Sequence, residues 1–223
     1  VPGSNESGVS DIAISPDGTR LAYRSGSPAK LFTRRLDQSK AFELPGTEGA
    51  FGPFFSPDGK WVGFATLGRL NKISAEGGAV VPLSDVANFA GASWGEDGNI
   101  IVADAVKGLV RVPAAGGSAE LMAEWVNGDR VLTVPQILPG GKAVLLVRVS
   151  GMFGSKSNSI QVMTLADRHR KTVVQGGTSP RYLATSNGAG YLTYLNQATL
   201  FAIPFDLDKL ETRGAAVPVL DDV

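Results

Sequence analysis

The chain has 223 residues, with 21 basic and 21 acidic side chains, one histidine and no cysteine. It is long enough to bury a core without disulfides, and its balanced charge excludes a global attraction to nucleic acid or to an anionic membrane. Zinc is excluded by the missing cysteines and the single histidine. No apolar run approaches the roughly 20 residues that span a bilayer. We therefore expect a soluble body, either cytoplasmic or extracytoplasmic (periplasmic) in a bacterium.

A turn motif recurs along the chain. Ser15-Pro16-Asp17-Gly18 is repeated as Ser56-Pro57-Asp58-Gly59, and looser copies follow at 95–98, 138–141 and 187–190; the first three steps between copies are 41, 39 and 43 residues. Proline presets the first central position of a type I turn, and glycine takes the left-handed position after it. Each copy therefore predicts a tight antiparallel hairpin.

Four strand-like runs accompany each turn. In chain order they are residues 11–14, 20–23, 31–34 and 41–44; 52–55, 61–64, 70–73 and 80–83; 91–94, 100–103, 109–112 and 119–122; 135–138, 143–146, 160–163 and 172–174; and 181–184, 191–194, 200–203 and 217–220. Proline recurs in the fourth runs, at Pro82 and Pro218, which suits an outermost strand because proline cannot donate to a ladder. Repeated units of this kind are typical of propeller blades.

The sequence therefore predicts an all-β fold, a β-propeller of about five four-stranded blades. We expect a single domain over 1–223, with repeats at approximately 9–49, 50–89, 90–128, 129–177 and 178–223. The alternative is an incomplete arc of a six- to eight-bladed propeller, whose open faces another copy or further sequence would cover. Nothing before Val9 resembles a donated outer strand, so the last run, 217–220, is expected to complete the fifth blade.

The repeats resemble the WD40-like (PD40) repeats of TolB-type propellers, in which a Ser-Pro-Asp-Gly turn joins the first two strands of a blade. They are most similar to the propeller region that follows the kinase domain in bacterial eukaryote-like serine/threonine protein kinases. The segments that carry the resemblance are LPGTEGA (44–50) leading into PFFSPDG (53–59), GASWGEDG (91–98), PQILPGGKAVL (135–145) and LFAIPFD (200–206). The resemblance implies the fold. It implies no kinase activity, because the chain has neither a Gly-rich phosphate loop nor a His-Arg-Asp catalytic loop.

The sequence offers no catalytic constellation. His169 lies in a polar turn among cations, and there is no Gly-x-Ser-x-Gly motif. Asp17, Asp58 and Asp97 could suggest a calcium site, but each belongs to a separate turn, and the turn accounts for the presence of the aspartate. We expect no catalytic residue, no metal and no cofactor. The alternative enzyme, a calcium-dependent lactonase-type hydrolase, needs carboxylates on the inner strands, where only Asp11 is clearly available.

Binding surfaces remain. Propellers commonly bind ligands at the mouth of the central channel, and strand phase predicts these residues there or in the adjoining loops: Asp11, Phe51, Ser93, Gln136, Arg181, Asn88, Phe89, Arg130 and Tyr182. A second candidate is the insertion at 150–158, where Met152 and Phe153 are expected to form a contact patch. The aromatic residues Trp61, Phe64, Tyr23, Tyr194 and Trp94 occupy repeating strand positions and are interpreted as core between blades.

The sequence thus favours a non-catalytic binding or scaffold module, which recognises a protein or small-molecule ligand and serves as the sensor part of a larger signalling protein. Nucleic acid is not an expected partner, because the basic clusters at Arg34-Arg35 and 168–171 lack interleaved aromatic side chains. Membrane insertion is not expected either. A third possibility is a self-assembling propeller fragment, a homo-oligomer formed through open blade faces.

Overall fold

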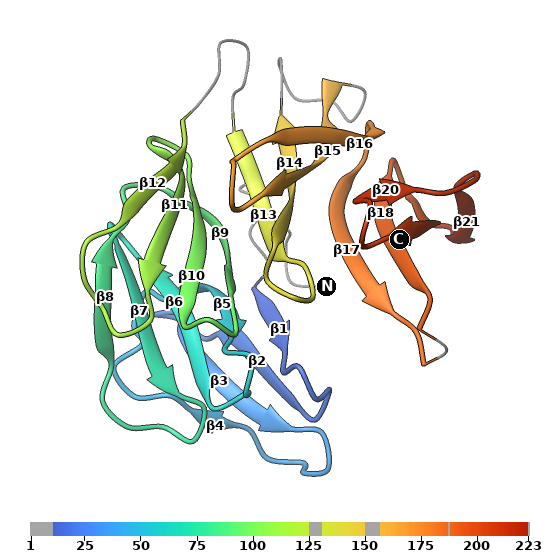
Figure 1. Ribbon diagram of the computed structural model, residues 1–223. Helices are drawn as coiled ribbons and strands as arrows, with labels where there is room; N and C mark the ends of the chain where they lie inside the picture. The colour runs from blue at the N-terminus through green and yellow to red at the C-terminus, as the bar shows by residue number, and fades with distance from the viewer. Residues whose placement is uncertain (1–10, 125–130, 150–156, 187, 223) are drawn as a thin grey trace. The chain divides into compact units, whose positions relative to one another are not determined.

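The computed structural model describes residues 11–124, 131–149, 157–186 and 188–222. These residues form 21 strands and no α-helix, and the strands assemble into five antiparallel sheets (Figure 1). Each sheet is a four-stranded propeller blade, and one of them carries an additional strand. The prediction of an all-β propeller with five blades is confirmed. None of the described segments is a helix with the length and apolar character needed to cross a membrane.

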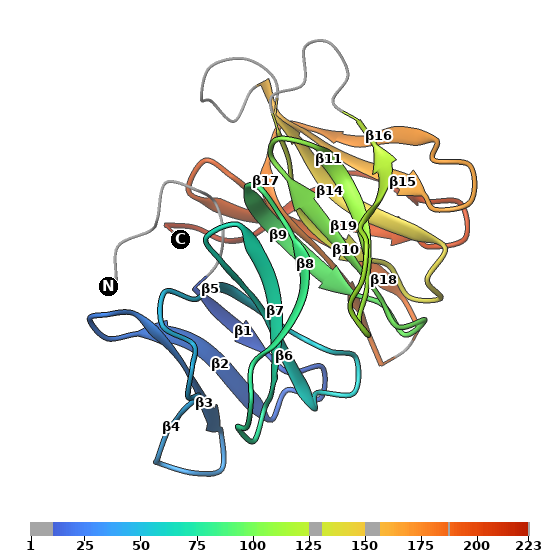
Figure 2. The ribbon, with the colours of Figure 1, turned by 90° about the vertical axis from the view of Figure 1, so that its left-hand side faces the viewer.

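The first compact unit, Val1–Met122, contains blades 1 to 3. Blade 1 consists of β1 (Ile12–Ile14), β2 (Arg20–Ser25), β3 (Lys30–Arg35) and β4 (Phe42–Glu43); blade 2 of β5 (Phe51–Phe55), β6 (Trp61–Thr66), β7 (Arg69–Ser74) and β8 (Val81–Asp85); blade 3 of β9 (Phe89–Trp94), β10 (Asn99–Asp104), β11 (Gly108–Pro113) and β12 (Glu120–Ala123). Within this unit β5 packs between β1 and β9, so the first strands of consecutive blades are neighbours (Figure 2).

The second compact unit, Ala123–Val223, contains blades 4 and 5. Blade 4 consists of β13 (Val131–Ile137), β14 (Ala143–Val149), β15 (Ser159–Thr164) and β16 (Arg170–Gln175); blade 5 of β17 (Thr178–Ala184), β18 (Gly190–Asn196), β19 (Thr199–Asp206), β20 (Glu211–Thr212) and β21 (Val217–Leu220). The predicted final strand is β21, which pairs with one end of β19, whereas the short β20, which was not predicted, pairs with the other end. The single domain and the closure of a ring stay predictions.

The recurrent turns are the hairpins that the motif predicts. In the first turn the Ser15 amide donates to the Arg20 carbonyl over 2.8 Å, and in the second the Ser56 amide donates to the Trp61 carbonyl over 2.9 Å. Gly18 and Gly59 have φ of 71° and 69°, a left-handed conformation that glycine adopts without strain. The Ser15 hydroxyl and the amide and hydroxyl of Thr19 donate to Asp17 and lower its pKa to about 2.

Blade 2 packs against a neighbouring blade on each of its faces. Because side chains alternate along a strand, Val62 and Phe64 of β6 enter the apolar cluster shared with blade 1, whereas Ala65 enters the cluster shared with blade 3. Gly63 lies on the same face as Ala65, and the ring of Phe54 covers it so closely that a Cβ there would lie 2.2 Å from Phe54 Cζ. We call these two packing zones the first seam (blades 1 and 2) and the second seam (blades 2 and 3).

Blades 4 and 5 share a third apolar cluster, which includes Leu145, Ile160, Leu192 and Tyr194. A pair of hydrogen bonds joins their first strands: the Tyr182 amide donates to Gln136 Oε1 over 2.8 Å, and Gln136 Nε2 donates to the Tyr182 carbonyl over 3.3 Å. The Gln136 side chain thus provides hydrogen bonds between the two sheets to the backbone of Tyr182.

Candidate functional site

The candidate site is an open groove of about 500 Å³ in the second seam. We call it the tryptophan groove, and it is lined by Ser56, Pro57, Asp58, Trp61, Trp94, Gly95, Glu96, Gly98 and Ala114. All of these residues belong to blades 2 and 3 of the first compact unit. The groove lies at the recurrent turns of these two blades, so the motif that builds the hairpins also builds its rim.

The two indoles come from strand ends that the turns fix. Trp61 begins β6 directly after its turn, and its amide donates to Ser56 Oγ over 2.9 Å. Trp94 ends β9 opposite Ile100 of β10, and its ring lies 6.2 Å from the ring of Phe54. Both indoles are half-buried. Each indole therefore packs on the core with part of its surface and presents the remainder to the groove.

A cation already lies beside the groove. Lys72 of β7 stands opposite Gly63, and its ammonium is 4.6 Å from the centre of the Trp61 ring, within the range of a cation–π interaction. The same ammonium donates to the Ala114 carbonyl over 2.6 Å. Lys72 therefore joins β7 of blade 2 to the turn after β11 of blade 3 and braces the Trp61 indole.

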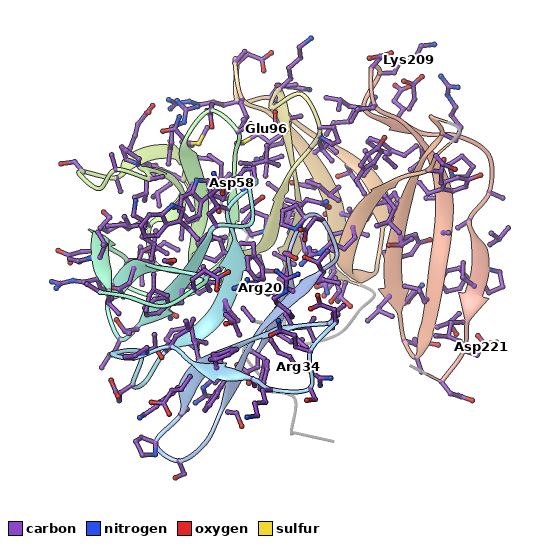
Figure 3. The ribbon with its side chains drawn as sticks, turned by 90° about the horizontal axis from the view of Figure 1, so that it is seen from below. Arg20, Arg34, Asp58, Glu96, Lys209 and Asp221 are labelled. Carbon is purple, nitrogen blue, oxygen red and sulfur yellow. The ribbon has the colours of Figure 1, made fainter. Side chains whose placement is uncertain are left out.

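Two carboxylates flank the indoles from neighbouring turns, Asp58 on blade 2 and Glu96 on blade 3 (Figure 3). The Ser56 hydroxyl donates to Asp58 over 2.6 Å and the Lys60 amide over 3.1 Å, and these two bonds lower the pKa of Asp58. Glu96 is exposed, and among the residues that the structure describes its carboxylate has no ion-pair partner. It occupies the turn position that holds Pro16 in the first turn and Pro57 in the second.

The corresponding place in the first seam is filled by an arginine. Arg20 begins β2 as Trp61 begins β6, and its amide donates to Ser15 Oγ over 2.9 Å, the same bond that Trp61 makes with Ser56. The Arg20 guanidinium donates to the Ala75 carbonyl over 2.6 Å and forms an ion pair with Glu76. In the second seam Ala114 and Ala115 stand where Ala75 and Glu76 stand in the first. The arginine and its carboxylate partner are thus both replaced there.

Several residues predicted at the channel mouth are core residues instead. The ring of Phe51 lies 5.9 Å from that of Phe89, edge to face, and both pack in the second seam. Tyr182 is 9% exposed and packs edge to face with Phe205 at 5.9 Å. The bulge in β5 shifts the alternation of side chains that the strand-phase prediction assumed for Phe51. Phe89 and Tyr182, which were predicted in loops, lie in β9 and β17.

The other predicted residues lie apart from the tryptophan groove. Asp11 precedes β1 and forms an ion pair with Arg24 at 3.5 Å; Ser93 of β9 is half-buried opposite Ile101; Gln136 is engaged with Tyr182 as described above. Arg181 of β17 donates to the Pro180 carbonyl over 3.0 Å. Desolvation lowers the pKa of the Arg181 guanidinium, although its side chain is exposed to solvent. The guanidinium keeps its charge nonetheless.

Asn88 is exposed in the loop before β9, and its carbonyl accepts from the Ala105 amide over 2.7 Å. The predicted loop residues Arg130, Met152 and Phe153 lie outside the described residues.

The groove was missed because its tryptophans were interpreted as core. That interpretation is right for Phe64 and Tyr194, which are buried, but Trp61 and Trp94 are only half-buried. A comparison of equivalent positions provides the missing signal: a large apolar side chain at 61 stands where the first repeat has Arg20, and an acidic one at 96 stands where it has proline. Both changes alter residues that flank a seam.

Metal-ligand groups do not gather within the described part of the chain. In that part no group of three or more His, Cys, Asp or Glu side chains is placed to hold a metal ion. His169 is exposed in the turn before β16, where its amide donates to Asp167 over 3.1 Å. Asp104, which is buried, accepts amide hydrogen bonds from Ala87 and Val106 and so stabilises the backbone of two loops.

Comparison with solved structures finds propellers. TolB from Acinetobacter baumannii superposes with a TM-score of 0.69 at 14% identity over 96% of this chain and 55% of that one. A putative TolB from Agrobacterium tumefaciens gives 0.68 at 14% identity over 94% and 79%. An oligogalacturonate lyase in complex with manganese gives 0.64 at 16% identity over 93% and 65%.

At these identities the similarity shows the fold alone, a β-propeller. This chain spans 55% and 65% of the lengths of TolB and of the lyase, respectively. No family model matches the sequence, and no curated protein matches it.

Proposed function

We propose that this protein is a non-catalytic binding module and that the tryptophan groove is its binding surface. The observation that carries the proposal is the pair of half-buried indoles, Trp61 and Trp94, which line an open groove beside the exposed carboxylates of Asp58 and Glu96. Ligand sites combine apolar and aromatic walls with a few polar groups. Indole rings contribute large contact areas to interfaces because one part of the ring system packs while another stays accessible.

The fold supports this proposal by holding both indoles still. Trp61 is fixed by its hairpin and by the Lys72 bridge to Ala114, and Trp94 is fixed by its strand and by Phe54. A preorganised surface loses little conformational freedom when a ligand binds. The propeller fold is compatible with binding and with catalysis, because propellers of one shape carry unrelated activities.

The finer role that we propose is that of a sensor or scaffold part of a larger bacterial signalling protein. The support is the resemblance of the repeats to the propeller region of bacterial eukaryote-like serine/threonine kinases, together with the propeller fold. In such a protein the propeller would recognise a peptide or small molecule, and the reaction would take place elsewhere.

Selection of peptides from a random dodecapeptide phage library tests the proposal. We expect peptides enriched on the wild-type protein to lose at least tenfold in affinity on the Trp94→Leu variant, and mass spectrometry to recover them uncleaved. The Trp61→Leu variant should act in the same direction. Leu67→Ala is the matched control, because Leu67 is 98% exposed and lies outside the groove. Enriched peptides that bind all three variants equally, or that are cleaved, would contradict the proposal.

A second candidate function is self-association through blade 1. Ile14, Leu21 and Tyr23 occupy positions at which blade 2 has Phe55, Val62 and Phe64, which the first seam buries. Ile14 is 58% exposed, whereas Phe55 is 8% exposed. This face of blade 1 therefore carries apolar side chains like those that the first seam buries, and we propose that a blade of a second copy covers it. Light scattering after size exclusion should then give more than the 23.2 kDa of one chain, and Ile14→Lys should restore the monomer.

A further inference from the structure

We propose that the tryptophan groove binds an arginine side chain of a partner peptide, between the Trp94 indole and the carboxylate of Glu96. This inference rests on the proposed function and adds the chemistry of the ligand. It is carried by three observations: the seam that precedes the groove holds an arginine at the equivalent place, the groove offers carboxylates and indole surface, and Trp61 stands in the groove at the position equivalent to Arg20.

The first seam shows that the space between two adjacent blades accepts a guanidinium. Arg20 reaches across from blade 1 to blade 2, its side chain is only 12% exposed, and it donates both to the Ala75 carbonyl and to Glu76. Arginine suits such a place because its planar group donates several hydrogen bonds in fixed directions and is less strongly hydrated than an ammonium. The first seam is therefore an internal example of the proposed interaction.

The second seam has no ion pair equivalent to that of Arg20 and Glu76, because Trp61 replaces Arg20 and Ala115 replaces Glu76. The Ala114 carbonyl, the equivalent of the Ala75 carbonyl, accepts from Lys72 instead, and an open groove lies beside it. Glu96, which replaces a proline, introduces a carboxylate that neither of the first two turns has at that position. The exchange removes an arginine from the protein and adds an indole and a carboxylate, which together bind a guanidinium by cation–π attraction and by charge-assisted hydrogen bonds.

The charges around the groove allow a cationic guest. Lys72 is the nearest base, but its ammonium is engaged with the Trp61 ring and the Ala114 carbonyl. Lys60, whose side chain is 78% exposed, forms an ion pair with Asp58 at 3.8 Å. Asp97 is occupied by the amide and side chain of Asn99. Glu96 is then the carboxylate that a guest meets, and Trp94 is the indole that Lys72 does not cover.

The probe is acetyl-Ala-Arg-Ala-amide, with the citrulline peptide as its neutral counterpart of nearly equal shape. We expect the indole N–H resonances of Trp61 and Trp94 to shift on titration with the arginine peptide. The affinity obtained from the same titration with the citrulline peptide should be at least fivefold lower. Affinity for the arginine peptide should fall as salt rises from 50 to about 300 mM, because the contact between exposed charges is screened.

Variants locate the contact. Glu96→Gln keeps the shape of the side chain and removes its charge, so we expect roughly a five- to tenfold loss of affinity for the arginine peptide and no loss for the citrulline peptide. Trp94→Leu should weaken both. Glu76→Gln is the matched control, because Glu76 is an equally exposed acid beside the first seam, where Arg20 already occupies it; it should change neither affinity.

Three results would overturn the inference. The first is equal affinity for the arginine and citrulline peptides. The second is an unchanged affinity of Glu96→Gln for the arginine peptide. The third is a shift of the Trp61 indole resonance that persists in Trp94→Leu. If the phage selection yields groove-dependent peptides without arginine, the proposed function stands and the arginine inference fails. If it yields no groove-dependent peptide but the arginine peptide shifts the indoles, the inference stands as single-residue recognition. If neither binds the groove, both fail.

Discussion

The two seams of blade 2 are built by the same repeat but differ in the side chains that lie beside the recurrent turns. The first is closed by Arg20, which bridges to Ala75 and Glu76 of the next blade, whereas in the second Lys72 bridges to Ala114 and an open groove lined by Trp61 and Trp94 lies beside it. The hairpin geometry is the same in both, since Arg20 and Trp61 make identical backbone bonds to Ser15 and Ser56. The difference teaches that a blade repeat can replace a structural ion pair by an open groove, the proposed binding surface, through three changes of side chain: Trp61 for Arg20, Ala115 for Glu76 and Glu96 for Pro57.

The largest loss of stability is expected from a substitution in the core of the first seam. Phe64 is fully buried at 0% exposure between blades 1 and 2, so Phe64→Ala should cost about 3–5 kcal/mol of unfolding free energy, through lost burial and the cavity left behind. Urea denaturation measures it. Leu67→Ala, at a 98% exposed position, should stay within about 0.5 kcal/mol. A loss below 1 kcal/mol for Phe64→Ala would mean that the first seam is not packed as described.

The next effect is expected at the second seam, where Phe54 covers Gly63. The Cβ of Gly63→Ala would lie 2.2 Å from Phe54 Cζ, so the ring must move and we expect a loss of about 1–3 kcal/mol. The double variant with Phe54→Leu should lose less than the sum of the two single variants, because a smaller side chain leaves room for the methyl group. Additive losses in urea denaturation would show that the two residues do not compete for the same space.

Removing the Arg20 bridge of the first seam is expected to lower the free energy of unfolding by less. Arg20→Met keeps most of the aliphatic stem and removes the bond to the Ala75 carbonyl, so we expect a loss of about 1 kcal/mol. Glu76→Gln should cost less than about 0.5 kcal/mol, because Glu76 is exposed and its ion pair is screened. The Arg20→Met variant also tests the comparison of the two seams. Its first seam should bind the arginine peptide, which the wild-type first seam does not bind.

The smallest effect is a pH dependence of the first turn. The pKa of Asp17 is lowered from 3.8 to about 2, chiefly by the Ser15 hydroxyl, so its stabilising contribution is complete above about pH 4 and is lost as the pH falls through 2. Asp17→Asn should therefore lower the melting temperature by a few degrees at pH 7, and the difference from wild type should shrink toward pH 2. A difference that stays constant from pH 7 to 2 would show that the carboxylate's charge is not involved.

The turn motif predicted more of the structure than any other feature of the sequence. Ser15-Pro16-Asp17-Gly18 and Ser56-Pro57-Asp58-Gly59 place the first hairpins within a residue or two of their positions, because proline and glycine fix backbone angles that no distant contact needs to supply. The bulge in β5 was not predicted, because a bulge depends on the register with the partner strand. That bulge changed the phase of Phe51 and took it from a predicted ligand surface into the core.

The sequence by itself determined the repeat, the hairpin corners and the all-β class, because turn residues and alternating apolar residues act over a few neighbours along the chain. Only the tertiary structure decided which side chains close a seam and which leave it open. Arg20 and Trp61 are equivalent positions of the repeat, 41 residues apart in the sequence, but only the structure shows that Arg20 bridges to the next blade and that Trp61 lines a groove. A seam joins residues from two sheets, so its chemistry depends on distances between blades that local sequence patterns do not contain.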